Sequence, residues 1–325
     1  MTSIRRRTAL LGALASSLGG GRALAADYPA RAIRLIVPYA PGGGADAVAR
    51  IIAKVAGGSM GQSIVVENKG GAGSIVGTDL VAKASPDGYT LLLGQSGPIS
   101  INPAVYKSLP YDPVKELAPV TMTNSYPYVL VINPKVEATT LKEFVALAKA
   151  QAGAFNYGTT GVGAANHLMS ELFCAKAGVK MTHIPYRGTA LAVADCVAGQ
   201  VTMVFGDPVS VLPHVNSGAL RAIAVTSPER SPVGPTVPTM AESGYPDVEA
   251  VAWHGIFVPA RTPQAIVDKL NVEIVKAVAN PEIKSLLSKQ AMSPVGSSQA
   301  EFAAFLKKDL ATWKDVAALA KVSVE

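Results

Sequence analysis

The amino-acid sequence predicts an α/β protein of two domains, each with a mostly parallel sheet covered by helices. Three observations lead to this prediction. Short apolar runs typical of strands alternate with helical patterns along most of the 325 residues, which is the rhythm of α/β folds. Glycine-rich loops follow strands in both halves of the chain. Hydrophobic residues make up 49% of the chain and charged residues 16%, a composition typical of a folded globular protein.

The N-terminal segment is predicted to lie outside this fold. Arg5–Arg7 precede a short apolar run, Ala9–Leu18, and Ala23–Ala25 reads Ala-Leu-Ala. This order is typical of a secretory signal peptide with an A-x-A cleavage site, and the apolar run is too short to anchor the chain in a membrane. We therefore expect residues 1–26 to be removed and the mature protein to reach the periplasm, by general secretion or by a twin-arginine route.

The charge of the mature chain gives no support for a nucleic-acid partner. The formal charge of +6 includes four arginines of the predicted signal peptide, which leave 25 basic residues against 23 acidic ones. No basic stripe with interleaved aromatic residues stands out. No later segment has the roughly 18 uninterrupted apolar residues of a membrane-spanning helix.

The predicted elements follow one another in three groups. The first group alternates strand and helix; its members are a strand over 32–37, a helix over 46–56, a strand over 63–69, a helix over 75–84 and a strand over 89–94. A long β-rich stretch over 117–134 leads to a second group, with strands over 155–159, 180–186, 201–206 and 220–226 and helices over 141–151, 167–178 and 190–200. The third group is a strand over 252–260 and helices over 263–278 and 299–320.

The last group is too short to form a domain of its own. We expect it to return to the first domain, which would then comprise residues 27–124 and 251–325. The second domain, 125–250, would be an insertion joined by two crossing strands. The two cysteines, Cys174 and Cys196, lie in helical patterns of this second domain. They are interpreted as buried free thiols, although export would also permit a disulfide.

The loop "PYAPGGGAD", residues 38–46, is the first candidate binding element. Its three glycines let the backbone turn sharply and approach a ligand closely. The helix that follows presents unpaired N–H groups and the positive end of its dipole, which favour an anion without any Arg or Lys. The loop "GTTGVGAANH", residues 158–167, repeats this arrangement in the second domain. Two helix N-termini, one per domain, could hold a small anion between them.

Other chemistries find weaker support in the sequence. There is no P-loop motif, and Ala47 stands where a dinucleotide fingerprint starting at Gly42 has its last glycine, with Glu67 as the acid expected further on. A dinucleotide-dependent enzyme thus remains a weak alternative. "GQSGP" is not a nucleophile elbow. The four histidines have no metal-binding spacing, so no metal or cofactor is predicted.

Several long stretches resemble the solute-binding receptors of tripartite tricarboxylate transporters, also called Bug receptors. Among them are "YPARAIRLIVPYAPGGGADAVAR", "VVENKGGAGSIVGTDLVAKASPDGYTLLLG", "NYGTTGVGAANHL" and "PTVPTMAESGYPDVEAVAWHGIFVPARTP". The resemblance covers essentially the whole mature chain in the same order. It implies a periplasmic binding protein type II fold, with a ligand cleft between two α/β domains. It further implies a monomer that captures a small carboxylate, has no enzymatic activity and delivers its ligand to membrane permease subunits; a sensor for a membrane kinase is the alternative.

The candidate ligand-binding residues lie in the two loops and at neighbouring strand ends. They are Tyr39, Ala40, Pro41, Gly42, Gly43, Gly44, Ala45 and Asp46 in the first loop, Thr159, Thr160, Gly163, Ala164, Ala165 and Asn166 in the second, and Gln95, Ser96, Asp207 and His254 at strand ends. Several have a structural alternative: Asp46 as a helix cap, Tyr39 and His254 as packing residues. Asp207 could accept a hydrogen bond from a ligand hydroxyl or ammonium.

Two positions depart from the pattern of the resembled family. Ala45 stands where the first loop commonly carries Ser or Thr, and Ala164 where the second commonly carries Ser. Each change removes a hydroxyl near the expected carboxylate, and a hydrogen bond is worth about 0.5–1.5 kcal/mol. We therefore expect a ligand less polar than citrate, such as an aromatic or branched monocarboxylate, and near-millimolar affinity for citrate.

Overall fold

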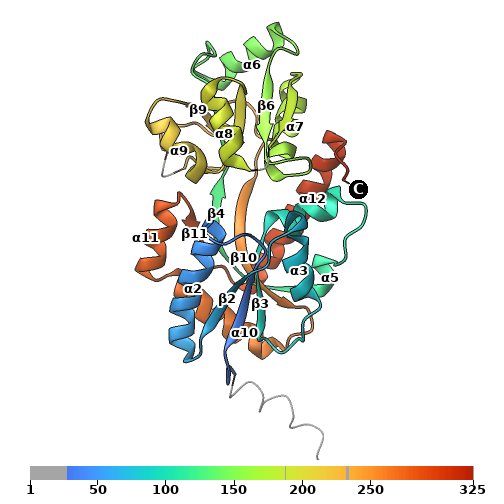
Figure 1. Cartoon of the computed structure of the whole chain (residues 1–325), viewed down its shortest axis with the longest axis vertical. Coiled ribbons are helices and arrows are strands. Elements are labelled where there is room, and N and C mark those ends of the chain that lie inside the picture. The colour runs from blue at the N-terminus through green and yellow to red at the C-terminus, as the bar shows by residue number, and fades with distance from the viewer. Residues whose placement is uncertain (1–27, 187, 232–233, 325) are drawn as a thin grey trace, which may run out of the picture.

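The computed structural model describes residues 28–186, 188–231 and 234–324, and the predicted signal peptide lies outside these residues. Figure 1 shows two lobes, one above the other, joined by long strands. The first lobe is built on a six-stranded sheet and the second on a five-stranded sheet. None of the described helices is long and apolar enough to cross a membrane.

The sheet of the first lobe has the strand order β11-β4-β10-β3-β1-β2. Its strands are β1 (Ile33–Val37), β2 (Ile64–Asn68), β3 (Thr90–Gln95), β4 (Leu117–Pro127), β10 (Val251–Pro259) and β11 (Ser293–Pro294). β1 pairs in parallel with β2 and β3, whereas β10 is antiparallel to both β3 and β4. The nearly continuous apolar runs of β1 and β3 fit strands that are covered on both faces.

The sheet of the second lobe has the order β7-β6-β8-β5-β9. Its strands are β5 (Val129–Ile132), β6 (Asn156–Thr159), β7 (Thr182–Pro185), β8 (Met203–Gly206) and β9 (Arg221–Val225). β6 is parallel to β7 and β8, and β5 is antiparallel to β8 and β9. Both sheets are thus mixed and not mostly parallel as expected, because each passage between the lobes delivers a strand that runs opposite to its neighbours: β5 in the second sheet and β10 in the first.

Helices cover both faces of the two sheets (Figure 1). They are α2 (Gly44–Met60), α3 (Ile75–Ala82), α4 (Asn102–Val105), α5 (Pro113–Glu116), α6 (Leu141–Ala150), α7 (Ala165–Ala177), α8 (Thr189–Ala198), α9 (Pro208–Asn216), α10 (Gln264–Val278), α11 (Pro281–Lys289) and α12 (Gln299–Ala320), with short helices of other types at Ala72–Ser74 and Gly97–Ile101. The sequence patterns missed α4, α5, α9 and α11, and the last three each begin with a proline after a capping Asp or Asn.

The long C-terminal helix α12 packs against both lobes. It begins with a capping box made by Ser298 and Glu301, a local signal that fixes its start. Phe302, near its beginning, is buried with residues of the first sheet, whereas Trp313 and Val316 join the apolar core around α7 of the second lobe. The expected return of this segment to the first domain therefore describes only part of its packing.

The two passages between the lobes fall close to the predicted domain boundaries. β4 stays in the first sheet up to Pro127, and β5 begins two residues later in the second sheet. The chain returns just before Val251, where β10 starts. The boundaries at 124/125 and 250/251 stay a prediction, since the lobes also share α12.

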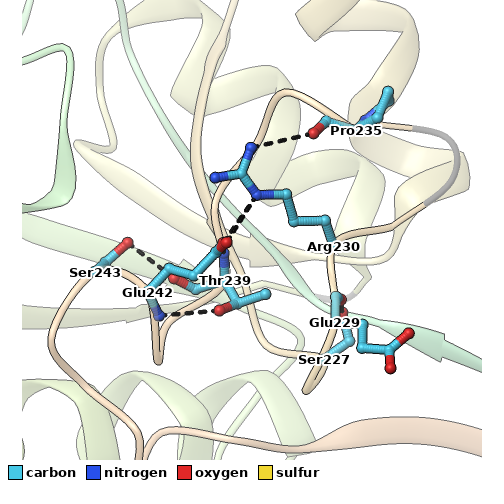
Figure 2. A network of polar contacts seen from close by, with 7 residues as sticks. All are labelled: Ser227, Glu229, Arg230, Pro235, Thr239, Glu242 and Ser243. Atoms are coloured by element: carbon cyan, nitrogen blue, oxygen red, sulfur yellow. Dashed lines mark hydrogen bonds and ion pairs between the residues drawn. The ribbon is translucent and has the colours of Figure 1, made fainter.

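In the proline-rich stretch before the return passage, an ion pair joins Arg230 to Glu242. Arg230 donates from its Nε to both carboxylate oxygens of Glu242, at 3.0 and 2.9 Å, and from Nη1 to the carbonyl of Pro235. Glu242 in turn accepts from the backbone N–H of Thr239 at 2.7 Å. Figure 2 shows this network folding the stretch back on itself.

Both cysteines are buried free thiols, in agreement with the first of the two interpretations. Cys174 lies in α7 and Cys196 in α8. Burial raises the pKa of each thiol to about 12. Neither thiol is therefore ionised near neutral pH.

Candidate functional site

The first glycine-rich loop joins β1 to α2. Gly42 has φ +88°, a conformation that glycine adopts without strain, and Gly43 caps α2 without any side-chain hydrogen bond. The first N–H groups of a helix have no partner inside the helix. This helix start therefore offers backbone donors and a partial positive charge to an anion.

The buried side chain of Asp46 connects this loop to α2 and β2 through hydrogen bonds. This side chain is 7% exposed, and the carboxylate accepts hydrogen bonds from the Gly42 N–H at 2.9 Å, from Arg50 Nε at 3.0 Å and from the side-chain amide of Asn68 at 3.0 Å. The Arg50 hydrogen bond is the main reason why the pKa of Asp46 lies below its usual value. Asp46 is thus a positioning residue of the loop, and it does not line either of the cavities between the lobes.

The second loop has the same construction in the other lobe. Gly161 and Gly163 have φ +127° and +77°, and Ala164 caps α7 without a side-chain hydrogen bond. Asn166 reaches back along the loop, and its Oδ1 accepts from the N–H and the hydroxyl of Thr160 at 3.1 and 3.0 Å. The second loop is therefore braced by its own side chains.

Behind the second loop lies a stack of aromatic and imidazole rings. His167 and His183 stack with ring centroids 4.1 Å apart, and Nδ1 of His167 accepts the N–H of Gly163 at 3.2 Å. Thr159 is fully buried and its hydroxyl lies 2.6 Å from Nε2 of His183. Thr159 consequently belongs to the support of the loop, and it lies outside the residues that line the cavity.

Two adjoining cavities lie between the lobes at the ends of these loops. One has a volume of about 420 Å³ and reaches the second loop. The other has a volume of about 310 Å³ and reaches the first loop. Both are lined by four residues in common: Tyr39, Gln95, Tyr126 and Asp207. We call the two together the cleft.

Most of the residues predicted from the sequence line this cleft. The lining includes Tyr39, Ala40, Gly43, Gly44, Ala45, Gln95, Ser96, Thr160, Gly163, Ala164, Ala165, Asn166, Asp207 and His254. Asp46 and Thr159 are buried behind it, Gly42 is exposed and lines neither cavity, and Pro41 borders a separate outer cavity beside Asn68. Two loops that lie far apart in the sequence are thus brought to one site.

Several lining residues were not predicted. Tyr126 and Tyr128 flank Pro127 at the passage between the lobes, and this proline between two aromatic residues was a signal in the sequence. Asn102, Thr189, Phe205, Gln290 and Met292 also line the cleft, but no local pattern marks them because they come from segments brought close only by the fold.

The cleft is aromatic and carries little charge. Neither cavity is lined by a Lys or Arg side chain, as far as the described residues go. Burial raises the pKa of Tyr39, Tyr126 and Tyr128, so their hydroxyls stay protonated and can donate hydrogen bonds. In the described part of the chain, no group of three or more His, Cys, Asp or Glu side chains could hold a metal ion.

His254 lies at the wall of the cleft on β10. It is 1% exposed, and its Nδ1 lies 2.9 Å from the side-chain nitrogen of Asn124. Burial lowers its pKa to about 4. His254 is therefore neutral near pH 7 and brings no positive charge to a bound anion.

Asp207 is the one carboxylate among the described residues that line the cleft. It caps α9, because its Oδ1 accepts the N–H of Ser210 at 2.9 Å and its Oδ2 accepts the Ser210 hydroxyl at 2.8 Å. It faces the first loop in one cavity and the second loop in the other. A ligand that fills both cavities must pass beside it.

Comparisons of the sequence and the overall structure with known proteins identify related proteins. The sequence model of the tripartite tricarboxylate transporter family receptor matches residues 48–320. Protein BugT of Bordetella pertussis is 37% identical over 316 residues, which cover 97% of each chain. Among solved structures, an R. palustris protein with adipate is 30% identical with a TM-score of 0.81 and covers 91% of this chain and 99% of its own. MatC from Rhodopseudomonas palustris with bound malate is 31% identical with a TM-score of 0.76, covering 89% and 99%.

Proposed function

The chain belongs to the tripartite tricarboxylate transporter receptor family, and we propose that it captures a small carboxylate in the cleft between its lobes. This is a family of solute-binding receptors and not of enzymes. The observation that carries the proposal is the pair of uncapped helix N-termini, at Gly43–Ala45 and Ala164–Asn166, which both border the cleft. Helix N-termini bind anions through backbone N–H groups.

The lining argues for a ligand less polar than citrate. Ala45 and Ala164 border the two cavities with methyl groups, and tyrosines and Phe205 supply much of the remaining wall. A ligand with one carboxylate could accept hydrogen bonds at a helix N-terminus and pack an aromatic or branched body against these rings. Citrate would bring three carboxylates into a cleft whose described lining has Asp207 and no Lys or Arg, so we propose that its affinity is near-millimolar.

Thermal unfolding against a panel of carboxylates tests the proposal. A ligand at 100 times its Kd adds about 2.7 kcal/mol to the free energy of unfolding, which should raise the Tm by several degrees. Isothermal titration calorimetry then gives the Kd of each hit. Micromolar affinity for citrate would contradict the expectation about polarity.

A single substitution can link binding to the first helix N-terminus. At Gly43 an added Cβ meets no atom within 4 Å, and φ is −84°, so Gly43→Asp fits the fold. Aspartate is a good N-cap, and its carboxylate would occupy the donors meant for the ligand. We expect an intact Tm and loss of carboxylate binding. The matched control is Gly58→Asp in the same helix, also in open space, which should bind normally; unchanged binding by Gly43→Asp would contradict the proposed site.

We further propose that the mature protein works in the periplasm and delivers its ligand to membrane permease subunits. The predicted signal peptide and the transporter named in the family description support this role. Uptake of the labelled ligand by cells that carry the wild-type chain, compared with cells carrying Gly43→Asp, is the direct test. Normal uptake with loss of a ligand-induced transcriptional response would instead favour a sensor.

A further inference from the structure

The cleft contains a carboxylate at the start of α9. Asp207 brings a carboxylate to both cavities, and among the described residues no Lys or Arg lines either one. The described ion pairs of the chain do not include Asp207. Among the described residues, no cation pairs with this carboxylate, which lines both cavities.

Asp207 also has hydrogen-bonding capacity left over. A carboxylate offers about four lone-pair positions, and in the described part of the chain two donors are bound, both from Ser210. These two bonds explain why Asp207 caps α9, and they leave acceptor capacity unused on a residue that lines both cavities. A hydrogen-bond donor on the ligand would complete this site.

A second acceptor without a partner lines the cavity that reaches the first loop. Gln290 lines this cavity, and its Oε1 is buried with no hydrogen-bond partner among the described residues. This oxygen lies 3.4 Å from the position that a Cβ on Gly44 would take, at the start of α2, so it belongs to the end of the cleft where the ligand carboxylate is proposed to bind. A selection at the other end of the ligand therefore depends on Asp207.

We propose that Asp207 makes the cleft select carboxylic acids that carry an ammonium or another hydrogen-bond donor away from the carboxylate, and reject simple dicarboxylates. This inference rests on the proposed function, since it assumes that one carboxylate lies at a helix N-terminus. A second carboxylate would have to pass Asp207, where like charges repel. An ammonium there would be attracted and would donate to the free lone pairs.

Pairs of ligands that differ only at one end test the selection. Succinate and 4-aminobutanoate, glutarate and 5-aminopentanoate, and adipate and 6-aminohexanoate are nearly equal in length, and one end changes from carboxylate to ammonium. We expect calorimetry at pH 7 to give at least tenfold tighter binding of the amino member in the pair that fits. Equal or tighter binding of the dicarboxylate would overturn the proposal.

The variant Asp207→Asn assigns the selection to the charge. Asparagine caps helices as well as aspartate does, so the fold should persist while the preference falls to threefold or less. Glu229→Gln makes the same charge change on an exposed residue of the same lobe outside the cleft, and it should keep the full preference. An unchanged preference in Asp207→Asn would also overturn the proposal.

The two proposals fail in different ways. If no member of any pair binds but another carboxylate binds and is lost in Gly43→Asp, the receptor proposal stands and the selection by Asp207 is wrong. If no carboxylate binds at all, the receptor proposal itself fails.

Discussion

Removing the carboxylate of Asp46 should loosen the first glycine-rich loop and weaken ligand binding. In Asp46→Ala, the Gly42 N–H loses its acceptor, and Arg50 and Asn68 each lose one of two acceptors. Hydrogen bonds to a charged group are worth about 1.5–3 kcal/mol each. The Arg50 side chain is 54% exposed and regains water, so the sum is discounted to about 3 kcal/mol of unfolding free energy.

The acid dependence of this contribution has a defined sign. The pKa of Asp46 is lowered in the folded protein, first by the Arg50 hydrogen bond. A lowered carboxyl pKa stabilises the fold above the unfolded value of about 4 and loses this effect as pH falls through the folded value. The gap between wild type and Asp46→Ala should therefore shrink below about pH 4.

Urea unfolding followed by tryptophan fluorescence measures the stability, and calorimetry measures the affinity for whichever carboxylate the panel identifies. We expect at least a tenfold loss of affinity, because the loop that presents the α2 N-terminus is no longer tethered. The control is Glu282→Ala, which removes a 56% exposed partner of Lys54 and should cost less than about 1 kcal/mol. A loss below about 1 kcal/mol in Asp46→Ala, or undiminished affinity, would refute this reasoning.

Three further predictions concern the interior of the first lobe and the thiols. Burial lowers the pKa of His254 to about 4. The contribution of the neutral imidazole to the free energy of unfolding is therefore complete above the unfolded pKa of about 6.5, and it falls by about 3 kcal/mol as pH drops toward 4. The free energy of unfolding of His254→Gln should depend less on pH in this range, and an equally steep profile would contradict this prediction. An added Cβ at Gly94 would lie 2.6 Å from the Phe257 ring, so Gly94→Ala should cost about 1–3 kcal/mol, whereas Gly58→Ala, in open space on a helix, should be neutral or stabilising by about 1 kcal/mol; equal midpoints in urea would count against this packing. Cys174 and Cys196 should react with a thiol reagent only at the rate of unfolding, since both are buried with the pKa of each thiol raised to about 12; rapid labelling of the native protein would refute this.

The two binding loops and the order of most elements follow from the sequence alone. Glycines that allow a sharp turn, followed by the first turn of a helix, form a local signal, and both loops indeed lead from a strand to an uncapped helix start. Apolar runs likewise mark β1 and β3 because covered strands are continuously apolar. The same local character makes the family recognisable from the sequence.

Which side chains face the ligand space depends on the fold in three dimensions. Asp46 stands next to the glycines in sequence, yet it turns inward because Arg50 and Asn68 supply donors there. Gln290 lies far along the chain, yet it shares a cavity with Gly44. The direction of a side chain depends in part on partners from other segments, such as Asn68 for Asp46, and backbone periodicity carries no information about these partners. The charge pattern of the cleft, and with it the expected choice of ligand, follows from that packing.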